Sequence, residues 1–225
     1  MVQRQESSSM KVSDAVDTRI SVRAFLPDPV PHDVLDRVLR RAARAASGGN
    51  LQPWRITVLT DQTLDRFRAL ITAGAPMGTQ YQIYPADLHE PYRTRRFAVG
   101  EAMYARLGIA RADKARRLEW FANNFRFFGA PAAIFVHVDR RMGPPQWSDL
   151  GMYLATLMLL LREEGYDSCA QEAWAMHHET VDKFVDADPD TMLFCGMAIG
   201  KRDLDHPVNG LRADRAPHDE WLRFM

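Results

Sequence analysis

The stretch Ser47-Gly48-Gly49-Asn50-Leu51-Gln52-Pro53-Trp54 stands between a helical run and a β-branched run, and therefore predicts a helix-to-strand corner. Gly48 and Gly49 permit backbone angles or a close approach that a Cβ atom forbids. The side-chain amides of Asn50 and Gln52 each offer a donor and an acceptor. Such a corner suits a planar ligand with alternating C=O and N–H groups at its edge. A helix that ends at a glycine C-cap, followed by a proline that stops it, is the alternative interpretation.

A second stretch, Arg19-Ile20-Ser21-Val22-Arg23-Ala24-Phe25, precedes an amphipathic run over residues 32–46. The two stretches, the gap between them and the intervening helical run resemble the N-terminal signatures of the FMN-dependent nitroreductase family. The resemblance extends over nearly the whole chain after residue 10. It implies an α+β, nitroreductase-like fold with a central, mostly antiparallel sheet flanked by helices. It also implies an intertwined homodimer with FMN sites at the subunit interface.

Arg19, Ser21 and Arg23 occupy alternate positions, so in an extended segment their side chains project to one side. Two guanidinium groups and a hydroxyl form a suitable cradle for a phosphate or a ribityl chain. The resemblance assigns this segment to the phosphate and the pyrimidine edge of FMN. A solvated basic turn is the alternative interpretation. The resemblance assigns four residues of the corner to the same cofactor: Ser47, Gly48, Asn50 and Gln52.

Two segments near the C-terminus complete the predicted site. The resemblance assigns phosphate contacts to Arg215 and, as a second choice, to Arg212, although two arginines in a tail are ordinarily surface residues. It also implies that the backbone amide of Ala173, which follows Glu172, lies near flavin N5 and tunes hydride transfer. Ala173 stands where the family commonly has glycine, so the backbone is less free here. Glu172 and Ala173 are the predicted catalytic positions.

The composition predicts an ordinary globular domain. The 225 residues are 46% hydrophobic and 26% charged, and they suffice for one core. The 29 basic and 29 acidic residues cancel, which predicts no general nucleic-acid or acidic-lipid surface. Met1 to Ser9 lacks the apolar core of a signal peptide, and the apolar run from Leu150 to Leu161 is too short for a membrane span. Cys169 and Cys195 predict buried free thiols in a cytoplasmic protein, with one disulfide as the alternative.

Two clusters of polar residues call for separate interpretation. His177-His178-Glu179 lacks the spacing that places two metal ligands on one helical face, so we expect a surface helix start and no metal site. Arg93, Arg95 and Arg96 lie beside a long predicted loop. Charge on a helix surface is the favoured interpretation of this cluster. Contact with an anionic substrate, or with the 2′-phosphate of NADPH, stays open.

Local patterns predict the order of the elements. Helices are expected at 13–16 (with Ser13 as its cap), 32–46, 61–72, 92–107, 113–127, 147–164 and 178–185, and strands at 54–60, 132–138, 167–171 and 192–199. The predicted domain limits are a flexible N-terminus (1–10), a single domain (11–225), a substrate-lid insertion within it (74–128) and a tail that packs on the partner (201–225). The helix at 147–164 is apolar nearly all round, which predicts burial partly against a second subunit.

The resemblance implies an NAD(P)H oxidoreductase that reduces nitroaromatic compounds by ping-pong, two-electron hydride transfer through flavin N5. NADH or NADPH is the expected donor. Tyr81, Tyr84, Tyr92 and some of the aromatic side chains at 120–128 are suited to stack on a small aromatic substrate. Two alternatives stay open. One is a quinone or enone reductase on the same flavin site, and the other is a flavin-storing or ligand-sensing protein with little turnover.

Overall fold

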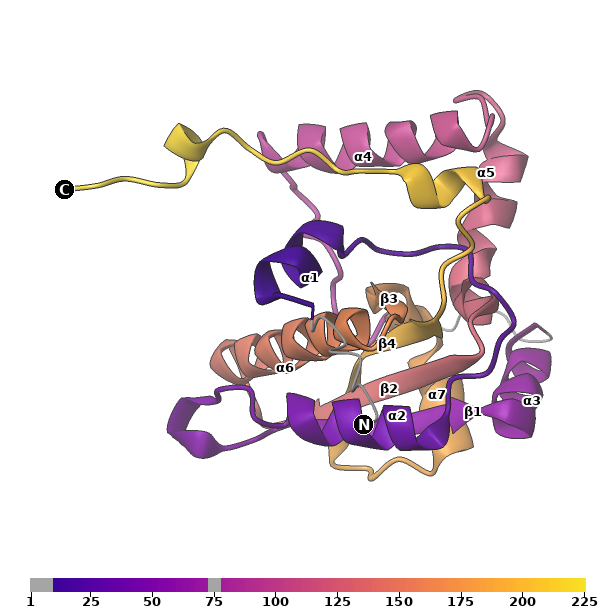
Figure 1. Ribbon diagram of the computed structural model, residues 1–225, viewed down its shortest axis with the longest axis vertical. Helices are drawn as coiled ribbons and strands as arrows, with labels where there is room; N and C mark the ends of the chain where they lie inside the picture. Colours follow the sequence, from indigo (N-terminus) through magenta and orange to yellow (C-terminus); the bar gives the residue numbers. More distant parts are fainter. Residues whose placement is uncertain (1–9, 73–77) are drawn as a thin grey trace, which may run out of the picture.

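A four-stranded antiparallel sheet lies at the centre of the structure, a computed structural model that describes residues 10–72 and 78–225 (Figure 1). The strand order is β1-β2-β4-β3. The strands are β1 (Arg55–Thr60), β2 (Ala132–Asp139), β3 (Asp167–Gln171) and β4 (Thr191–Gly200). The mostly antiparallel sheet that was predicted is thus confirmed, and the predicted limits of β3 match those observed.

The two faces of the sheet bury alternate residues of the same strand, as the two-residue period of a β-strand requires. On β2, Ile134 and Val136 face one hydrophobic cluster, whereas Ala133 and Phe135 face a second cluster. All four side chains are fully buried. A strand that is apolar on both faces needs cover on both, and helices provide it.

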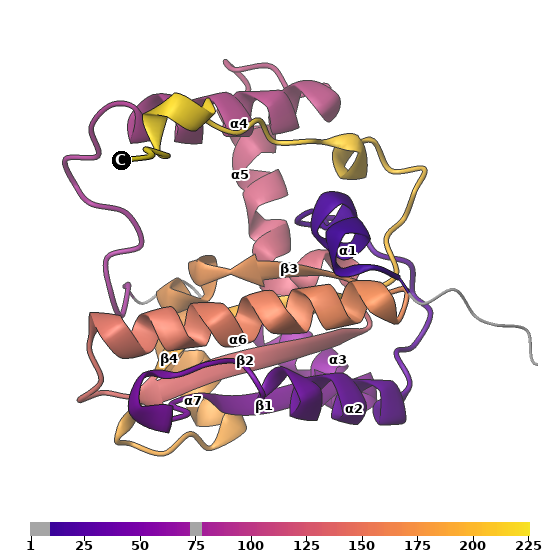
Figure 2. The ribbon, with the colours of Figure 1, turned by 60° about the vertical axis from the view of Figure 1, so that its left-hand side comes forward.

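Helices cover both faces of the sheet (Figures 1 and 2). The first cluster brings together the sheet, α2 (His32–Ala42) and the long α6 (Pro144–Glu163), against which α1 (Val12–Thr18) packs. The second cluster contains residues of α3 (Asp61–Thr72), α7 (His178–Val185) and the short helical segments η2 (Asn123–Gly129) and η3 (Glu172–His177).

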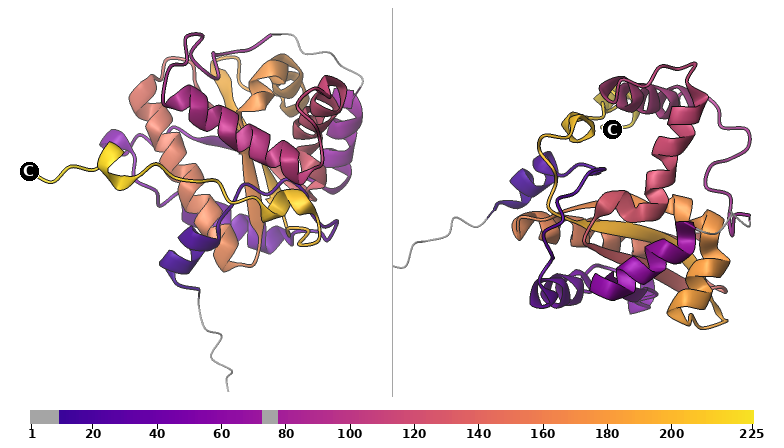
Figure 3. Two further views of the ribbon diagram at one scale, coloured as in Figure 1. Left: turned by 90° about the horizontal axis from the view of Figure 1, so that it is seen from above. Right: turned by 90° about the vertical axis from the view of Figure 1, so that its right-hand side faces the viewer.

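A further layer stands apart from the sheet and its covering helices. It contains α4 (Tyr92–Arg106), and α5 (Lys114–Ala122) leads from it back toward the sheet (Figures 1 and 3). The C-terminal segment runs along α4 and carries two short turns, η4 (Pro207–Gly210) and η5 (His218–Glu220). The predicted helix at 92–107 is therefore confirmed. Of the predicted loop and lid, residues 74–77 lie outside the described residues.

Several predicted helix limits are wrong, for local reasons. The cap of α1 is Lys11, whose N–H donates to the carboxylate of Asp14 at 3.3 Å, so Ser13 lies inside the helix. Helix α6 begins at Pro144, three residues before the predicted start, because a proline in the first turn lacks only an N–H that has no partner within the helix. The helix predicted over 113–127 is two elements in the structure, because α5 ends at Ala122 and the 3₁₀ segment η2 follows it. The predicted helix over 32–46 likewise ends at Ala42.

Cys169 and Cys195 are both buried and free, as predicted, and belong to opposite clusters of the core. In the part of the chain that the structure describes, no helix combines the length and the apolar character that a bilayer crossing requires.

Candidate active site

A cavity of about 440 Å³ lies where β3 passes into η3, opposite α4. Arg23, Gln171, Glu172 and Ala173 line it from the side of the sheet. From the other side it is lined by residues of the 83–128 region, among them Tyr84, Arg96, Met103, Trp120, Phe121 and Phe128. The cavity therefore combines a polar wall at the sheet with a largely aromatic wall opposite.

The segment around Arg23 reaches the cavity because it lies against β3. Ser21 forms a parallel bridge with Ser168, and the N–H of Val22 donates to the carbonyl of Ser168 at 3.1 Å. The segment is therefore extended, the conformation in which the side chains of Arg19, Ser21 and Arg23 project to one side. Among the described residues, Arg19 and Arg23 make no ion pair. Burial raises the pKa of the neighbouring Cys169 thiol, and the charges of Arg23 and Arg19 act in the opposite direction.

The C-terminal segment fixes Arg23 from the other side. The N–H of Arg23 donates to the side-chain oxygen of Asn209 at 2.9 Å, and the amide nitrogen of Asn209 donates to the carbonyls of Ala24 and Asp203, each at 2.8 Å. Asn209 is buried. Sequence reasoning missed this residue, and its position before Gly210 in an irregular tail gave no signal for it.

Gln171 lines the cavity and also carries a buried polar atom without a hydrogen-bond partner among the described residues. Its side chain is 3% exposed, and its amide nitrogen donates to the backbone carbonyl of Asn124 at 2.7 Å. The Oε1 atom is buried and has no hydrogen-bond partner among the described residues. A buried acceptor without a donor is costly, so this atom suits a ligand that brings an N–H or O–H group. The sequence signal was available, since Gln171 is a polar residue at the end of an apolar strand.

Glu172 and Ala173 follow immediately, and both line the cavity. The strand ends at Gln171 and the chain turns into η3, so the backbone at 172–173 borders the cavity. Glu172 also contributes negative charge here, since it adds to the raised pKa of the buried Cys169 and Cys195 thiols, for which burial is the main cause. The structure thus brings Arg23, Glu172 and Ala173 together around one cavity.

The glycine-amide corner lies elsewhere on the chain. Gly49, Asn50 and Gln52 have φ angles of 58°, 57° and 50°, and the N–H of Gly48 donates to the buried Asp149 at 3.1 Å. The helix before the corner ends at Ala42 and is capped by Ala43, so the alternative of a glycine C-cap is wrong. Residues 50–52 are exposed, and none of residues 47–52 lines the cavity. The corner and Arg23 are not brought together within one chain.

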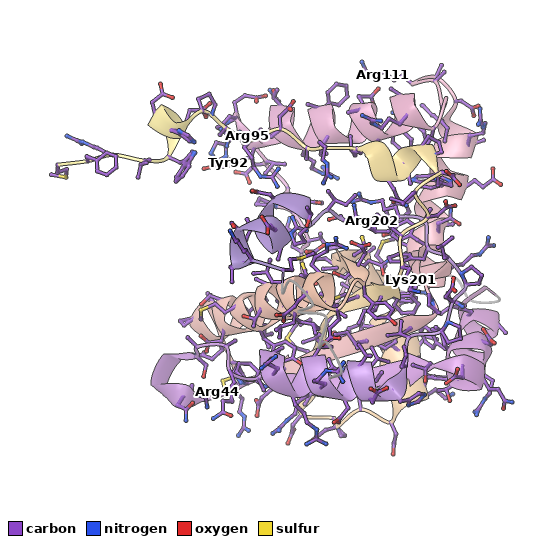
Figure 4. All side chains as sticks on the ribbon, in the orientation of Figure 1. Arg44, Tyr92, Arg95, Arg111, Lys201 and Arg202 are labelled. Atoms are coloured by element: carbon purple, nitrogen blue, oxygen red, sulfur yellow. The ribbon has the colours of Figure 1, made fainter. Side chains whose placement is uncertain are left out.

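The C-terminal arginines also lie away from the cavity, although Leu211 lines it. Arg212 and Arg215 are exposed. Arg215 donates to the carbonyls of Ala213 and Asp214, and it borders a separate pocket together with Arg95, at the start of α4 (Figure 4). Their assignment to the phosphate stays a prediction.

The aromatic residues of the 74–128 region divide by position. Tyr84 lines the cavity, whereas Tyr81 donates its hydroxyl to the carbonyl of Phe194 in the body of the protein. Tyr92 lies at the start of α4 and does not line the cavity (Figure 4).

His177 was expected on the surface, but it is only 3% exposed. Its ring packs against the ring of Phe125, with 4.4 Å between the two centroids, so the surface interpretation of His177 is wrong.

Comparison with known proteins identifies the family. Residues 16–201 match the sequence profile described as "Nitroreductase family". Over 212 residues the chain is 34% identical to 4-nitrobenzoate reductase from Pseudomonas putida, with 93% of each chain covered.

Two solved structures agree with this identification. The FMN and NADPH-dependent nitroreductase NfnB from Sphigopyxis sp. strain HMH is 46% identical with a TM-score of 0.92, over 96% of this chain and 99% of that one. The FMN-dependent nitroreductase NfnB from Mycobacterium smegmatis, solved in complex with NADPH, is 30% identical with a TM-score of 0.89, over 96% and 100% of the two chains. The predicted nitroreductase-like fold is confirmed, and this chain belongs to the nitroreductase family.

Proposed function

We propose that this chain is an FMN-dependent NAD(P)H oxidoreductase that reduces nitroaromatic compounds. The observation that carries the proposal is the cavity itself, in which Arg23 makes no ion pair and Gln171 Oε1 makes no hydrogen bond among the described residues. A flavin mononucleotide offers an anionic phosphate to the first and a polar ring edge to the second. The relatives named above, which are FMN-dependent or reduce a nitroarene by name, support the same activity.

The residues present fit the cofactor. Arg23, which lines the cavity, would hold its phosphate and pyrimidine edge together with Arg19 and Ser21, which belong to the same extended segment but do not line the cavity. Gln171 Oε1 would accept an N–H group, and the backbone at Glu172 and Ala173 would border its ring. Bound FMN supplies a carrier that takes two electrons from NAD(P)H and passes them to an acceptor. The aromatic wall of Trp120, Phe121 and Phe128 provides apolar area against which a planar substrate packs. No side-chain nucleophile is required of the protein.

The proposal includes a homodimer, because the glycine-amide corner at residues 47–52 does not line the cavity of its own chain. Residues 50–52 are exposed, and α6 exposes apolar surface that includes Met152, at 39%. The tail exposes Trp221, Phe224 and Met225 at 65%, 89% and 106%. A dimer that covered α6 and the tail would bury these side chains. In the proposed dimer, Ser47, Gly48, Asn50 and Gln52 of one subunit complete the cavity of the other, and the tail packs on the partner.

The buried free thiols support a cytoplasmic location as part of the same proposal, because reducing compartments keep thiols unpaired.

The visible spectrum of the purified protein tests the proposal. We expect a yellow protein whose flavin band bleaches when NADH or NADPH is added without oxygen, and whose colour returns when 4-nitrobenzoate follows. Faster reoxidation by menadione than by any nitroarene would favour the quinone reductase. A yellow protein that does not bleach with either nucleotide would favour the flavin-storing alternative. A colourless protein that takes up no added FMN would refute the proposal.

A further inference from the structure

Three arginines at the start of α4, Arg93, Arg95 and Arg96, have different environments. Arg93 pairs with Glu90, with 2.8 Å between Nε and the carboxylate. Arg95 pairs with Glu220 of the C-terminal segment, which runs beside it (Figure 4). Arg96 makes no ion pair among the residues that the structure describes, and of the three it alone lines the cavity. All three side chains are exposed, but only Arg96 lies at the cavity and has no charged partner among the described residues.

The guanidinium group of Arg96 is oriented by an aromatic ring. Its central carbon lies 4.1 Å from the centroid of the Tyr84 ring, and both residues line the cavity. A guanidinium that stacks on a ring keeps its N–H groups at the edge, where they are available to a planar acceptor. Tyr84 thus limits the conformations of Arg96 without neutralising its charge.

The other residues that line the cavity leave the charge of Arg96 as the main electrostatic feature on the side of α4. The other charged residues that line the cavity are Arg23 and Glu172, and both belong to the side of the sheet. Under the proposed function, Arg23 is engaged by the cofactor, and Glu172 repels anions. On the side of α4 the neighbours of Arg96 are apolar or aromatic, including Val99, Met103 and Tyr104. A substrate bound there meets Arg96, which has no ion pair among the described residues, against a largely aromatic surface.

We propose that Arg96 is a specificity residue that selects nitroarenes carrying a carboxylate over neutral nitroarenes. This inference rests on the proposed function and names its substrate class. A benzoate-type carboxylate is planar and accepts two parallel N–H groups from a guanidinium, while its ring packs on the aromatic wall. The nitro group, at the other end of the ring, then points toward the side of Gln171 and Ala173.

Steady-state kinetics with an acid and its neutral ester test the inference. We expect wild-type protein to have a higher kcat/KM for 4-nitrobenzoate than for methyl 4-nitrobenzoate. Arg96→Gln should lower this acid-to-ester ratio by about tenfold, mainly through KM for the acid, as loss of one charge-assisted contact predicts. Arg96→Lys should restore part of the ratio. The control Arg93→Gln removes a neighbouring charge outside the cavity and should leave the ratio unchanged.

Two results would overturn the inference while the proposed function stood. One is an acid-to-ester ratio that Arg96→Gln does not change. The other is a change in the NADPH-to-NADH ratio of kcat/KM with the acid-to-ester ratio intact, which would assign Arg96 to the 2′-phosphate.

Calorimetric binding of benzoate separates this inference from the proposed function. The ligand undergoes no turnover, so the measurement needs only the protein as purified. We expect Arg96→Gln to weaken benzoate binding by about tenfold and Arg93→Gln to leave it unchanged. If nitroarene reduction failed while benzoate binding still depended on Arg96, the proposed function would fall and the carboxylate site would remain. Equal benzoate binding by wild type and Arg96→Gln would refute the site itself.

Discussion

Asn209 holds the backbone of Arg23 from a position 186 residues later in the chain, with 2.9 Å between the Arg23 nitrogen and Asn209 Oδ1. The nitrogen of the same amide, Nδ2, donates to the carbonyl of the next residue, Ala24. One buried side chain therefore sets the path of the segment that carries the proposed phosphate ligands. The C-terminal segment contributes to the cavity through this contact and through Leu211, whereas Arg212 and Arg215 lie away from it.

Replacing Asn209 should affect stability and cofactor binding together. Asn209→Leu removes three hydrogen bonds and leaves the N–H of Arg23 without its partner, so we expect the free energy of unfolding to fall by about 2–4 kcal/mol. FMN should also bind more weakly, because Arg23 loses its fixed position. Urea unfolding and flavin content after dialysis measure the two effects. Asp205→Ala, at an exposed position of the same segment, is the control, and equal results for the two variants would contradict the role of Asn209.

The sequence allowed the central elements to be predicted where the pattern is local. The limits of β3 and α7 agree with the structure. Gly165 lies just before β3, and Asp186, with a φ angle of 51°, ends α7. The break between α5 and η2 was not predictable from the pattern. Phe127 and Phe128 have φ angles of 52° and 51°, which bulky residues adopt only under tertiary constraint, and both rings pack in the core.

The site was predictable only in part, because several of its residues make their contacts with residues that are distant in the sequence. Helical spacing places Arg93 and Arg96 three residues apart on similar faces, yet their environments differ because Glu90 pairs with one and the cavity lies beside the other. Arg95 finds its partner at Glu220, 125 residues away. The burial of His177 likewise depends on Phe125, which no local pattern connects to it.

A buried ion cluster at the start of β3 should be sensitive to loss of one charge. Asp167 is 2% exposed and accepts from Arg162 at 2.9 Å and from Arg202 at 2.7 Å. Arg202, labelled in Figure 4, also donates to the carbonyl of Thr18. Asp167→Asn leaves two arginines without their shared carboxylate. We expect the free energy of unfolding to fall by about 3–5 kcal/mol in urea titrations.

An exposed pair serves as the control for that substitution. Asp36 and Arg40 lie one helical turn apart on α2, with side chains 60% and 79% exposed. Asp36→Asn removes the same charge in water and should cost about 0.5 kcal/mol or less. Equal losses for Asp36→Asn and Asp167→Asn would show that burial does not decide the effect.

Stability should fall as the pH drops below about 6.5, the ordinary pKa of histidine, in part because of His177. Burial lowers the pKa of His177 in the folded protein, so between the two pKa values the unfolded chain binds more protons. Its contribution is therefore complete above the unfolded pKa and is lost as the pH falls. Urea midpoints between pH 7.5 and 5 should decline less steeply for His177→Gln and for His177→Phe. Because the two variants pack differently, a weaker pH dependence in both would identify the titration of His177 as its cause. An unchanged pH dependence in both variants would contradict this role of His177.

A mixed dimer tests whether each flavin site draws on two chains. Arg23→Ala removes a phosphate ligand, and Asn50→Gly with Gln52→Gly removes both corner amides, with glycine tolerating the positive φ at these positions. Each variant homodimer has two defective sites and should lose its flavin on dialysis. In a dimer of one Arg23→Ala chain and one corner-variant chain, the geometry proposed here leaves one site with Arg23 and the corner both intact.

The mixed dimer is purified through two different affinity tags, one on each chain, and its flavin content is measured. We expect it to retain about half of the flavin of the wild-type dimer, because one site holds both defects and the other holds neither. If Arg23 and the corner acted within one chain, every site in the mixed dimer would carry one defect, and the flavin content would be as low as in the parent variants. That outcome would also reassign the exposed corner, whose amides would then have no role in the cavity.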